Sequence, residues 1–458
     1  MDDTIAAIAT PFGEGGIGII RISGEEAERI LEEVFVPHGR ASDDKESRRL
    51  MYGHIVDPAD GSTIDEVLAV FMKGPHTYTG EDVAEIDCHG GIVPLRKTLE
   101  LVYEHGAIPA ERGEFTKRAF LNGRIDLSQA EAVIDLIRAK ADKTFDVAMD
   151  QLEGKLSREI RKIRADLMDL LVELTVNIDY PDEDIEVITY EALTEGLRKT
   201  GKAVDRLLAS SNTGRLISEG IRVAIIGKPN VGKSSLMNAL LRESRAIVTD
   251  IPGTTRDTIE ESLSIDGVPV VLTDTAGIRE TSDKIETIGI ERSKASVGSA
   301  DLVLFMIDGS RDLDEEDRFI AGHLEENKTV VVINKTDLDQ KVSAEEIKKL
   351  AGGAEIIETS LAEDTGTEIV EKTILSRVMS GETTQGSSIT VTNARHEKLL
   401  RDAAQSISDA LVLTEQEEPL EIIEIDVNQA YESLGEIIGE SVGDDILDEV
   451  FSRFCLGK

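Results

Sequence analysis

The most restrictive feature of the chain is a glycine-rich segment, GKPNVGKSS, at residues 227–235. An apolar run at 222–226 precedes it, and residues 235–241 have the character of a helix. A strand, a flexible loop and a helix in this order point several backbone N–H groups at one phosphate, with the positive field of the helix N-terminus behind them. The segment therefore predicts a phosphate-binding loop in which Lys233 reaches the outer phosphates and Ser234 offers its hydroxyl to Mg²⁺.

Two further motifs, DTAG at 274–277 and NKTD at 334–337, follow apolar runs. Asp274 is suited to hold Mg²⁺ through water, and the N–H of Gly277 to contact the γ-phosphate. Asp337 can accept hydrogen bonds from guanine N1–H and N2–H₂, which adenine does not offer, so GTP is the predicted nucleotide. The expected GTP contacts are Asn230, Val231, Gly232, Lys233, Ser234, Ser235, Thr249, Asp250, Ile251, Pro252, Gly253, Thr254, Thr255, Asp274, Thr275, Ala276, Gly277, Asn334, Lys335, Asp337 and Ser360, with Ser234 and Thr255 as Mg²⁺ ligands.

The means of positioning the attacking water differs from that of Ras-type proteins. Ile278 follows Gly277 where those proteins have a water-orienting glutamine. The side chain of Asn230 and the carbonyls of 249–254 suit a monovalent cation, which would do the electrostatic work of an arginine finger. Stabilisation of the loop itself accounts for Asn230 equally well, so the residues alone leave both hypotheses open.

The pattern of apolar and turn-forming residues changes along the chain, and these changes predict its domains. Residues 1–118 mix short strand-like runs (17–22, 67–71, 83–86) with turn residues, which indicates an α+β domain. Residues 119–216 have few prolines and apolar residues at helical spacing, and 380–458 return to that pattern at 395–413 and 429–453. Between them, 217–379 alternate strands (222–226, 268–273, 302–307, 329–333, 355–358) with helices, as in a mostly parallel sheet. We therefore expect a Ras-like P-loop GTPase domain inserted into a helical domain and preceded by an α+β domain.

The amphipathic pattern of the first helical stretch rests on ten apolar residues, and Pro181 is expected to break it. These residues are Ile134, Ile137, Leu152, Leu156, Ile160, Ile163, Leu167, Leu170, Leu171 and Leu174.

Charge and composition exclude several classes of protein. The chain has 50 basic and 90 acidic residues, a formal net charge of −40, which argues against a general nucleic-acid coat protein. It has no apolar run long enough to span a membrane and no signal-peptide pattern at its start, so a cytoplasmic protein without a membrane partner is expected. Two cysteines, Cys88 and Cys455, are too few for a disulfide framework.

Segments outside the nucleotide motifs carry a family resemblance. They are 3–11, 15–24 (GGIGIIRISG), 78–82 (YTGED), 89–91 (HGG), 113–122 (GEFTKRAFLN) and the last five residues, FCLGK, at 454–458. With these segments the chain resembles the tRNA modification GTPase family MnmE (TrmE) from end to end.

The resemblance implies a folate site and a cation-assisted GTPase. Arg21, Glu85, Arg124 and Lys458 match the family's contacts with 5-formyl-tetrahydrofolate, an analogue of the 5,10-methylenetetrahydrofolate donor; Arg124 stands where many members have lysine. The implied K⁺ ligands are Asn230, Thr249, Ile251 and Thr254, and Glu286 matches the family's water-orienting catalytic glutamate.

The implied activity is addition of a carboxymethylaminomethyl or aminomethyl group to C5 of the wobble uridine of tRNA. The family acts as a homodimer with an FAD-containing partner, in a heterotetramer, and GTP hydrolysis drives its conformational cycling. Cys455 would lie at the folate-side chemical centre, although an inert small apolar residue is the alternative. A ribosome-assembly GTPase and a purely structural dimerisation protein are the competing hypotheses; neither explains both the intact GTP motifs and the two ends of the chain.

Overall fold

The computed structural model describes residues 3–38, 47–179, 189–243, 260–274, 298, 300–379 and 389–458. By its contacts the chain divides into two compact units. One comprises Met1–Ile134, Leu152–Ile160 and Leu434–Lys458, and the other Asp135–Gln151 and Arg161–Ser433. Among the described residues, no helix has both the length and the apolar character needed to cross a bilayer.

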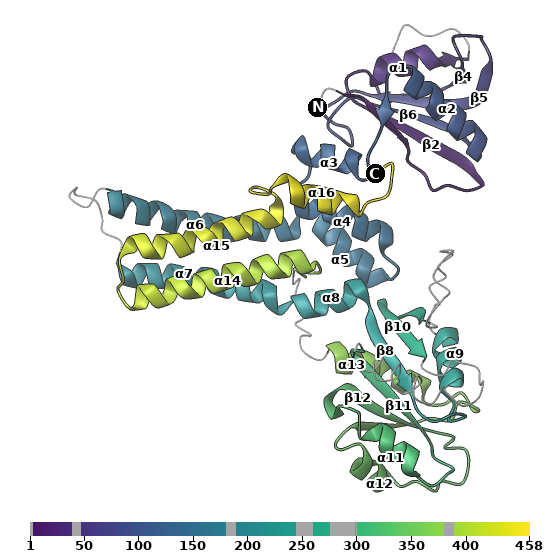
Figure 1. Cartoon of the computed structure of the whole chain (residues 1–458), viewed down its shortest axis with the longest axis vertical. Coiled ribbons are helices and arrows are strands. Elements are labelled where there is room, and N and C mark those ends of the chain that lie inside the picture. Colours follow the sequence, from purple (N-terminus) through teal and green to yellow (C-terminus); the bar gives the residue numbers. More distant parts are fainter. Residues whose placement is uncertain are drawn as a thin grey trace. The chain divides into compact units, whose positions relative to one another are not determined.

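The first unit contains a seven-stranded sheet in the order β3-β4-β5-β6-β2-β1-β7 (Figure 1). Neighbouring strands are antiparallel except for the parallel pair β1 and β7. The strands are β1 (Ile5–Ile8), β2 (Gly15–Ser23), β3 (Phe35–Pro37), β4 (Met51–Val56), β5 (Thr63–Met72), β6 (Val83–Gly90) and β7 (Ile108–Pro109). The three strands predicted for this region are confirmed within β2, β5 and β6.

Two helices, α1 (Ala27–Val34) and α2 (Ile92–Glu104), pack against one face of this sheet. The strands alternate, so that Ile20, Ile22 and Ile86 are buried in the core with these helices. Their neighbours Arg21 and Glu85 therefore point to the opposite face of the sheet.

A small helical cluster completes the first unit. It is built from α3 (Glu114–Leu121), α4 (Leu127–Arg138) and α16 (Asp444–Ser452), with Phe451 and Phe454 buried among them. Helical periodicity was predicted over 429–453, and the structure divides this range between α15 (Leu420–Ile438) and α16, with a break between them that was not predicted. At the break Gly439 has φ +84° and lies so close to Phe120 that a Cβ would be 2.7 Å from its ring. The left-handed backbone ends α15, as glycine commonly does at a helix C-terminus.

The helical part of the second unit pairs segments from both sides of the α/β domain. Its helices are α5 (Asp142–Leu152), most of α6 (Lys155–Asp179), α7 (Tyr190–Ala209), α8 (Ser211–Glu219), α14 (Ala394–Glu415) and part of α15. Helices α7 and α14 lie side by side, joined by an Arg198–Glu415 ion pair of 2.7 Å (Figure 1). The predicted insertion of the α/β domain into a helical domain is therefore confirmed.

The predicted apolar stripe is confirmed along α6, where Leu156, Ile160, Ile163, Leu167, Leu170, Leu171 and Leu174 are all buried. It is also confirmed for Ile134 of α4 but wrong for Ile137 near the end of that helix, which is 45% exposed because it lies off the face that carries Ala130 and Ile134. Pro181 lies outside the described residues.

The inserted domain is a six-stranded sheet in the order β13-β12-β11-β8-β10-β9. The strands are β8 (Ile221–Ile226), β9 (Glu260–Ile265), β10 (Val268–Asp274), β11 (Leu302–Asp308), β12 (Thr329–Asn334) and β13 (Glu355–Glu358). All five predicted strands are present and mutually parallel. The unpredicted sixth, β9, is an antiparallel edge strand that forms a hairpin with β10.

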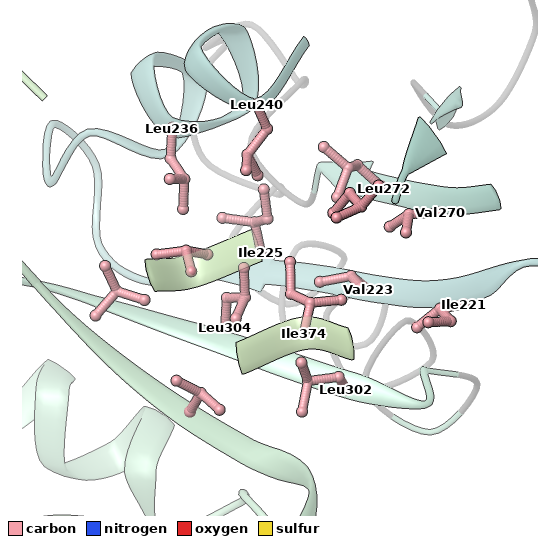
Figure 2. Packing of buried hydrophobic residues seen from close by; sticks show 14 of the residues in the cluster. Ile221, Val223, Ile225, Leu236, Leu240, Val270, Leu272, Leu302, Leu304 and Ile374 are labelled. Atoms are coloured by element: carbon pink, nitrogen blue, oxygen red, sulfur yellow. The ribbon is translucent and has the colours of Figure 1, made fainter. Parts of the chain in front are cut away.

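Helices cover both faces of this sheet. Figure 2 shows Leu236 and Leu240 of α9 (Lys233–Glu243) packing on β8 and β10, and Ile374 of α13 (Thr367–Met379) lies in the same core. The other face packs against α11 (Glu315–Ala321) and α12 (Ala344–Leu350). As in other parallel α/β folds, the loops at the carboxyl ends of the strands are where a ligand is expected.

Candidate functional site

The glycine-rich loop at 227–232 joins β8 to α9, as predicted. Gly227 has φ +144°, and a Cβ there would lie 2.4 Å from the carbonyl oxygen of Met306. Gly232 has φ +109°, and its Cβ would lie 2.2 Å from Nδ2 of Asn334. Both positions therefore require glycine, for backbone conformation and for space. Asn230 also has a positive φ, +65°, and its side chain is exposed at the loop.

Lys233, at the first turn of α9, is buried, with 8% of its surface exposed. Its Nζ donates to the carbonyl oxygens of Gly227 and Lys228, both at 2.7 Å. These bonds hold the ammonium at the loop, beside the helix N-terminus that favours a phosphate. Ser234 and Ser235, the next residues, are exposed.

The guanine motif is bonded directly to this loop. Asn334, only 3% exposed, donates from Nδ2 to the carbonyl oxygen of Val231 at 2.8 Å, and its Oδ1 accepts from the N–H of Leu361 at 3.3 Å. One amide thus fastens the phosphate loop, the end of β12 and the loop after β13 together. Asp337 is exposed, and one of its carboxylate oxygens accepts from the Ser360 hydroxyl at 2.6 Å.

Lys335, in the same motif, has φ +66° and ion-pairs with Asp308 at 2.6 Å. Burial would raise the pKa of Asp308, but hydrogen bonds from Lys335 and Ser310 outweigh it and hold the pKa below its usual value. Asp308 therefore stays ionised and keeps the aliphatic stem of Lys335 in place.

These motifs surround a single cleft of about 700 Å³. Its volume falls in the range of small-molecule sites, and polar groups enter it from one end of the sheet. The lining residues are Pro229, Asn230, Gly232, Lys233, Ser234, Ser235, Asn334, Lys335, Asp337, Leu338, Leu361 and Ala362.

Part of the predicted site lies outside the described residues: Thr249, Asp250, Ile251, Pro252, Gly253, Thr254, Thr255, Thr275, Ala276, Gly277 and the proposed catalytic Glu286. Asp274 is the last residue of β10, and its backbone is in register with Ile225 of β8, just before the phosphate loop.

A second cluster brings together the four residues predicted for folate. Arg21 and Glu85 are directly opposite each other on β2 and β6, and Nε of Arg21 donates to Glu85 at 2.7 Å. The guanidinium carbons of Arg21 and Arg124 lie 5.2 and 4.8 Å from the ring centre of Tyr78, within cation–π range of one ring.

Lys458 reaches this cluster through the segment 454–458. The side chain of Phe454 is buried, and Leu456 forms a backbone bridge with Arg112. Gly457 has φ +87°, and a Cβ there would be 2.2 Å from the carbonyl oxygen of Ile8. Burial and the nearby charge of Arg21 lower the pKa of Lys458.

The charges of this cluster favour an anionic or acceptor-rich ligand. Arg21 and Lys458 lie near the carboxylate of Glu85, and Arg124 shares the Tyr78 ring with Arg21. Nη1 of Arg21 is buried without a hydrogen-bond partner among the described residues. A buried, unsatisfied guanidinium nitrogen is costly unless an acceptor binds it.

The two cysteines differ sharply. Cys455 is exposed in the segment that carries Lys458, whereas Cys88 is buried, and burial raises its pKa to about 12. Tyr78 was not assigned a role from the sequence, because only the fold places its ring beside Arg21 and Arg124.

Known proteins resemble the chain along its whole length. Residues 4–124 match the family described as the GTP-binding protein TrmE N-terminus, and residues 127–455 the MnmE helical domain. The tRNA modification GTPase MnmE of Alkaliphilus metalliredigens is 50% identical over 459 residues, covering 100% of both chains. The protein of the same name from Bacillus subtilis is 48% identical over 458 residues, again covering 100% of both. A solved G domain of the FeoB iron transporter from T. maritima is 28% identical, with a TM-score of 0.27, over 34% of this chain and 98% of that one.

Proposed function

The chain belongs to the MnmE family of tRNA modification GTPases, and we propose that it couples GTP hydrolysis to modification of C5 of the wobble uridine of tRNA. The observation that carries this proposal is the cleft on which the phosphate loop, the NKTD segment, Leu361 and Ala362 converge. In it the phosphates would lie against Lys233 and the N-terminus of α9, and the guanine edge against Asp337.

Metal ions complete the proposed nucleotide site. The exposed Ser234 hydroxyl at the start of α9 suits Mg²⁺, with Thr255 as a second ligand and Asp274 acting through water. We place K⁺ at Asn230, Thr249, Ile251 and Thr254; the exposed, left-handed Asn230 at the cleft supports this. Mg²⁺ and K⁺ would neutralise charge that develops on the phosphates, while Glu286 orients the attacking water.

The second cluster is the proposed site of the one-carbon donor, 5,10-methylenetetrahydrofolate. The unsatisfied Nη1 of Arg21, together with Arg124 and Lys458, suits the acceptor groups of a folate. The exposed position of Cys455, three residues before Lys458, supports a chemical role for its thiol at this site.

The remaining proposals rest on family membership. They are a homodimer, a heterotetramer with an FAD-containing partner that contributes to tRNA binding, a cytoplasmic location, and domains at 1–118, 119–216, 217–379 and 380–458. The order of the described elements, with α7 before the α/β sheet and α14 after it, supports an α/β domain between two helical segments.

Reconstitution tests the function directly. The chain, an FAD-containing partner, unmodified tRNA, GTP, Mg²⁺, K⁺, methylenetetrahydrofolate and either glycine or an ammonium salt as nitrogen donor are incubated, and the wobble nucleoside is analysed by mass spectrometry. We expect a mass increase at uridine that is absent with Lys233→Ala. GTP hydrolysis without any modified nucleoside would instead favour the ribosome-assembly hypothesis.

The folate site has its own test, calorimetric titration with 5-formyl-tetrahydrofolate. Arg21→Ala should abolish measurable binding, because it removes the guanidinium opposite Glu85. Arg29→Ala is the matched control, since Arg29 is an exposed arginine of the same domain with its own ion pairs to Glu26 and Glu33. Equal binding by both variants would remove Arg21 from the site.

A further inference from the structure

Lys228 belongs to the phosphate loop but does not line the nucleotide cleft. Its side chain lies on the other side of the loop, beside a cavity of about 20 Å³ lined by Lys228, Pro229, Val231, Ile307, Asp308, Arg311, Asp312 and Asp317. The nucleotide contacts proposed above belong to other residues of this loop, and the Lys228 side chain, which is 16% exposed, makes different contacts.

The Lys228 ammonium is held by two carboxylates of α11. Nζ lies 2.7 Å from Oδ2 of Asp314 and 2.7 Å from Oδ2 of Asp317. These two aspartates also cap α11 reciprocally, because each side chain accepts from the backbone N–H of the other. Burial alone would lower the pKa of Lys228, but the bonds to the two aspartates outweigh it and raise the pKa. Lys228 therefore remains charged at neutral pH.

Asp317 depends on this lysine more than Asp314 does. Asp317 is 2% exposed, whereas the Asp314 side chain is 57% exposed. The Oδ1 atom of Asp317 has no hydrogen-bond partner among the described residues, and the adjoining cavity is large enough for one water molecule. A buried carboxylate of this kind is strongly unfavourable without its cationic partner.

The backbone of Lys228 contacts the phosphate-binding lysine. Its carbonyl oxygen accepts from Nζ of Lys233 at 2.7 Å. The side chain of Lys228 is anchored to α11 while its carbonyl orients the Lys233 ammonium. Two contacts therefore connect α11 to the phosphate site: the ion pairs of the Lys228 side chain with the aspartates, and the bond from Lys233 to the Lys228 carbonyl.

We propose that Lys228 is a positioning residue for GTP binding: its ion pairs with Asp314 and Asp317 fix the peptide that orients the ammonium of Lys233 toward the phosphates. The same contacts tie the N-terminal end of α11 to the phosphate loop.

The test uses the full-length protein and separates phosphate binding from base binding. Lys228→Met alone leaves Asp317 buried and unpaired, so the informative variant is Lys228→Met combined with Asp317→Asn, whose amide oxygen can still accept from Asp314. We expect native circular dichroism, unchanged affinity for guanosine and about tenfold weaker affinity for GTP and GDP, as for one displaced charge-assisted contact. Lys228→Arg should retain most of the affinity, and Lys328→Met, a control at an exposed lysine paired with Glu325, should bind as the parent does.

A second background shows whether the effect passes through Lys233. In Lys233→Met protein, adding the Lys228 and Asp317 changes should weaken GTP binding no further, because the group that they position is already gone. The same tenfold loss in that background would overturn the proposal. It would also be overturned if the folded double variant bound GTP as the parent does, or lost guanosine and GTP affinity equally.

Discussion

At the scale of single residues, Asn334 shows how a recognition motif can act as a structural joint. The sequence predicts Asn334 for the guanine site because NKTD is a specific pattern, and the structure places this residue in the lining of the cleft. What the sequence leaves out is that the amide is 97% buried, with 3% exposed, and bonded to Val231 and Leu361, because these contacts come from strands far apart in the chain. Tyr78 is the same case in the first domain, where only tertiary structure places its ring beside two arginines.

Replacing one carboxylate oxygen of Asp337 by an amide nitrogen should change which purine base the protein prefers. In Asp337→Asn, one acceptor oxygen becomes an N–H₂ donor, which opposes the N2–H₂ of guanine but matches the O2 of xanthine. We expect GTP affinity to fall by a factor of about 10² or more and XTP to become a substrate. Competition of GTP and XTP against a fluorescent nucleotide measures both, with Asp339→Asn, a neighbouring exposed aspartate, as the control.

The two thiols should react at very different rates. At pH 8 the exposed Cys455 should react with a thiol reagent within minutes, whereas Cys88, with its pKa raised to about 12 by burial, should react only after unfolding. A native count of one thiol and a denatured count of two is the expected result. Because Cys88 ionises only in the unfolded chain as the pH rises past about 8.5, it should also lower stability progressively above that pH. Two thiols reacting in the native protein would contradict the placement of Cys88.

At the scale of elements, the backbone conformation of the segment 454–458 depends on Gly457. Alanine there would be strained at φ +87° and would clash with the carbonyl oxygen of Ile8. We expect Gly457→Ala to displace Lys458 and weaken binding of 5-formyl-tetrahydrofolate while leaving GTP turnover intact. Gly61→Ala is a matched control, since Gly61 has φ +75° with no atom near its Cβ position. If both variants bind the folate equally, the clash has no bearing on the site.

The sequence predicts β8, β11 and β12 of the inserted sheet well because these parallel, buried strands are continuous apolar runs between turn residues. It does not predict β9, whose half-polar sequence, EESLSI, is typical of an edge strand. The break between α15 and α16 was missed for another reason. The helical spacing of apolar residues continues on both sides of Gly439, and the contact with Phe120 that accompanies the turn is tertiary.

At the scale of the whole molecule, the net charge of −40 predicts that any salt stabilises the fold, whereas the proposed cation site predicts that only K⁺ increases GTP turnover. Screening of self-repulsion should raise the midpoint of thermal unfolding to the same extent in KCl and NaCl as either is increased from about 0.05 to 0.5 M. GTP turnover should increase in KCl alone if the proposed cation site at Asn230 operates. Parallel calorimetry and phosphate-release assays, with choline chloride as a third salt, measure the two responses. Equal turnover in all three salts would remove the K⁺ proposal and leave the stability result unaffected.

The Ser210 hydroxyl accepts a hydrogen bond of 3.1 Å from the backbone N–H of Val391, and Gly214 leaves no room for a Cβ beside the carbonyl of Val391. The chain therefore leaves the helical domain and returns to it at one place, with some 180 residues between the two passages. A genetic deletion that joins position 210 to position 391 through a short glycine linker would need to span only a few ångströms. Such a deletion would remove α8 together with the α/β sheet, and chain passages this close together are what allow a folded module to be inserted into another domain.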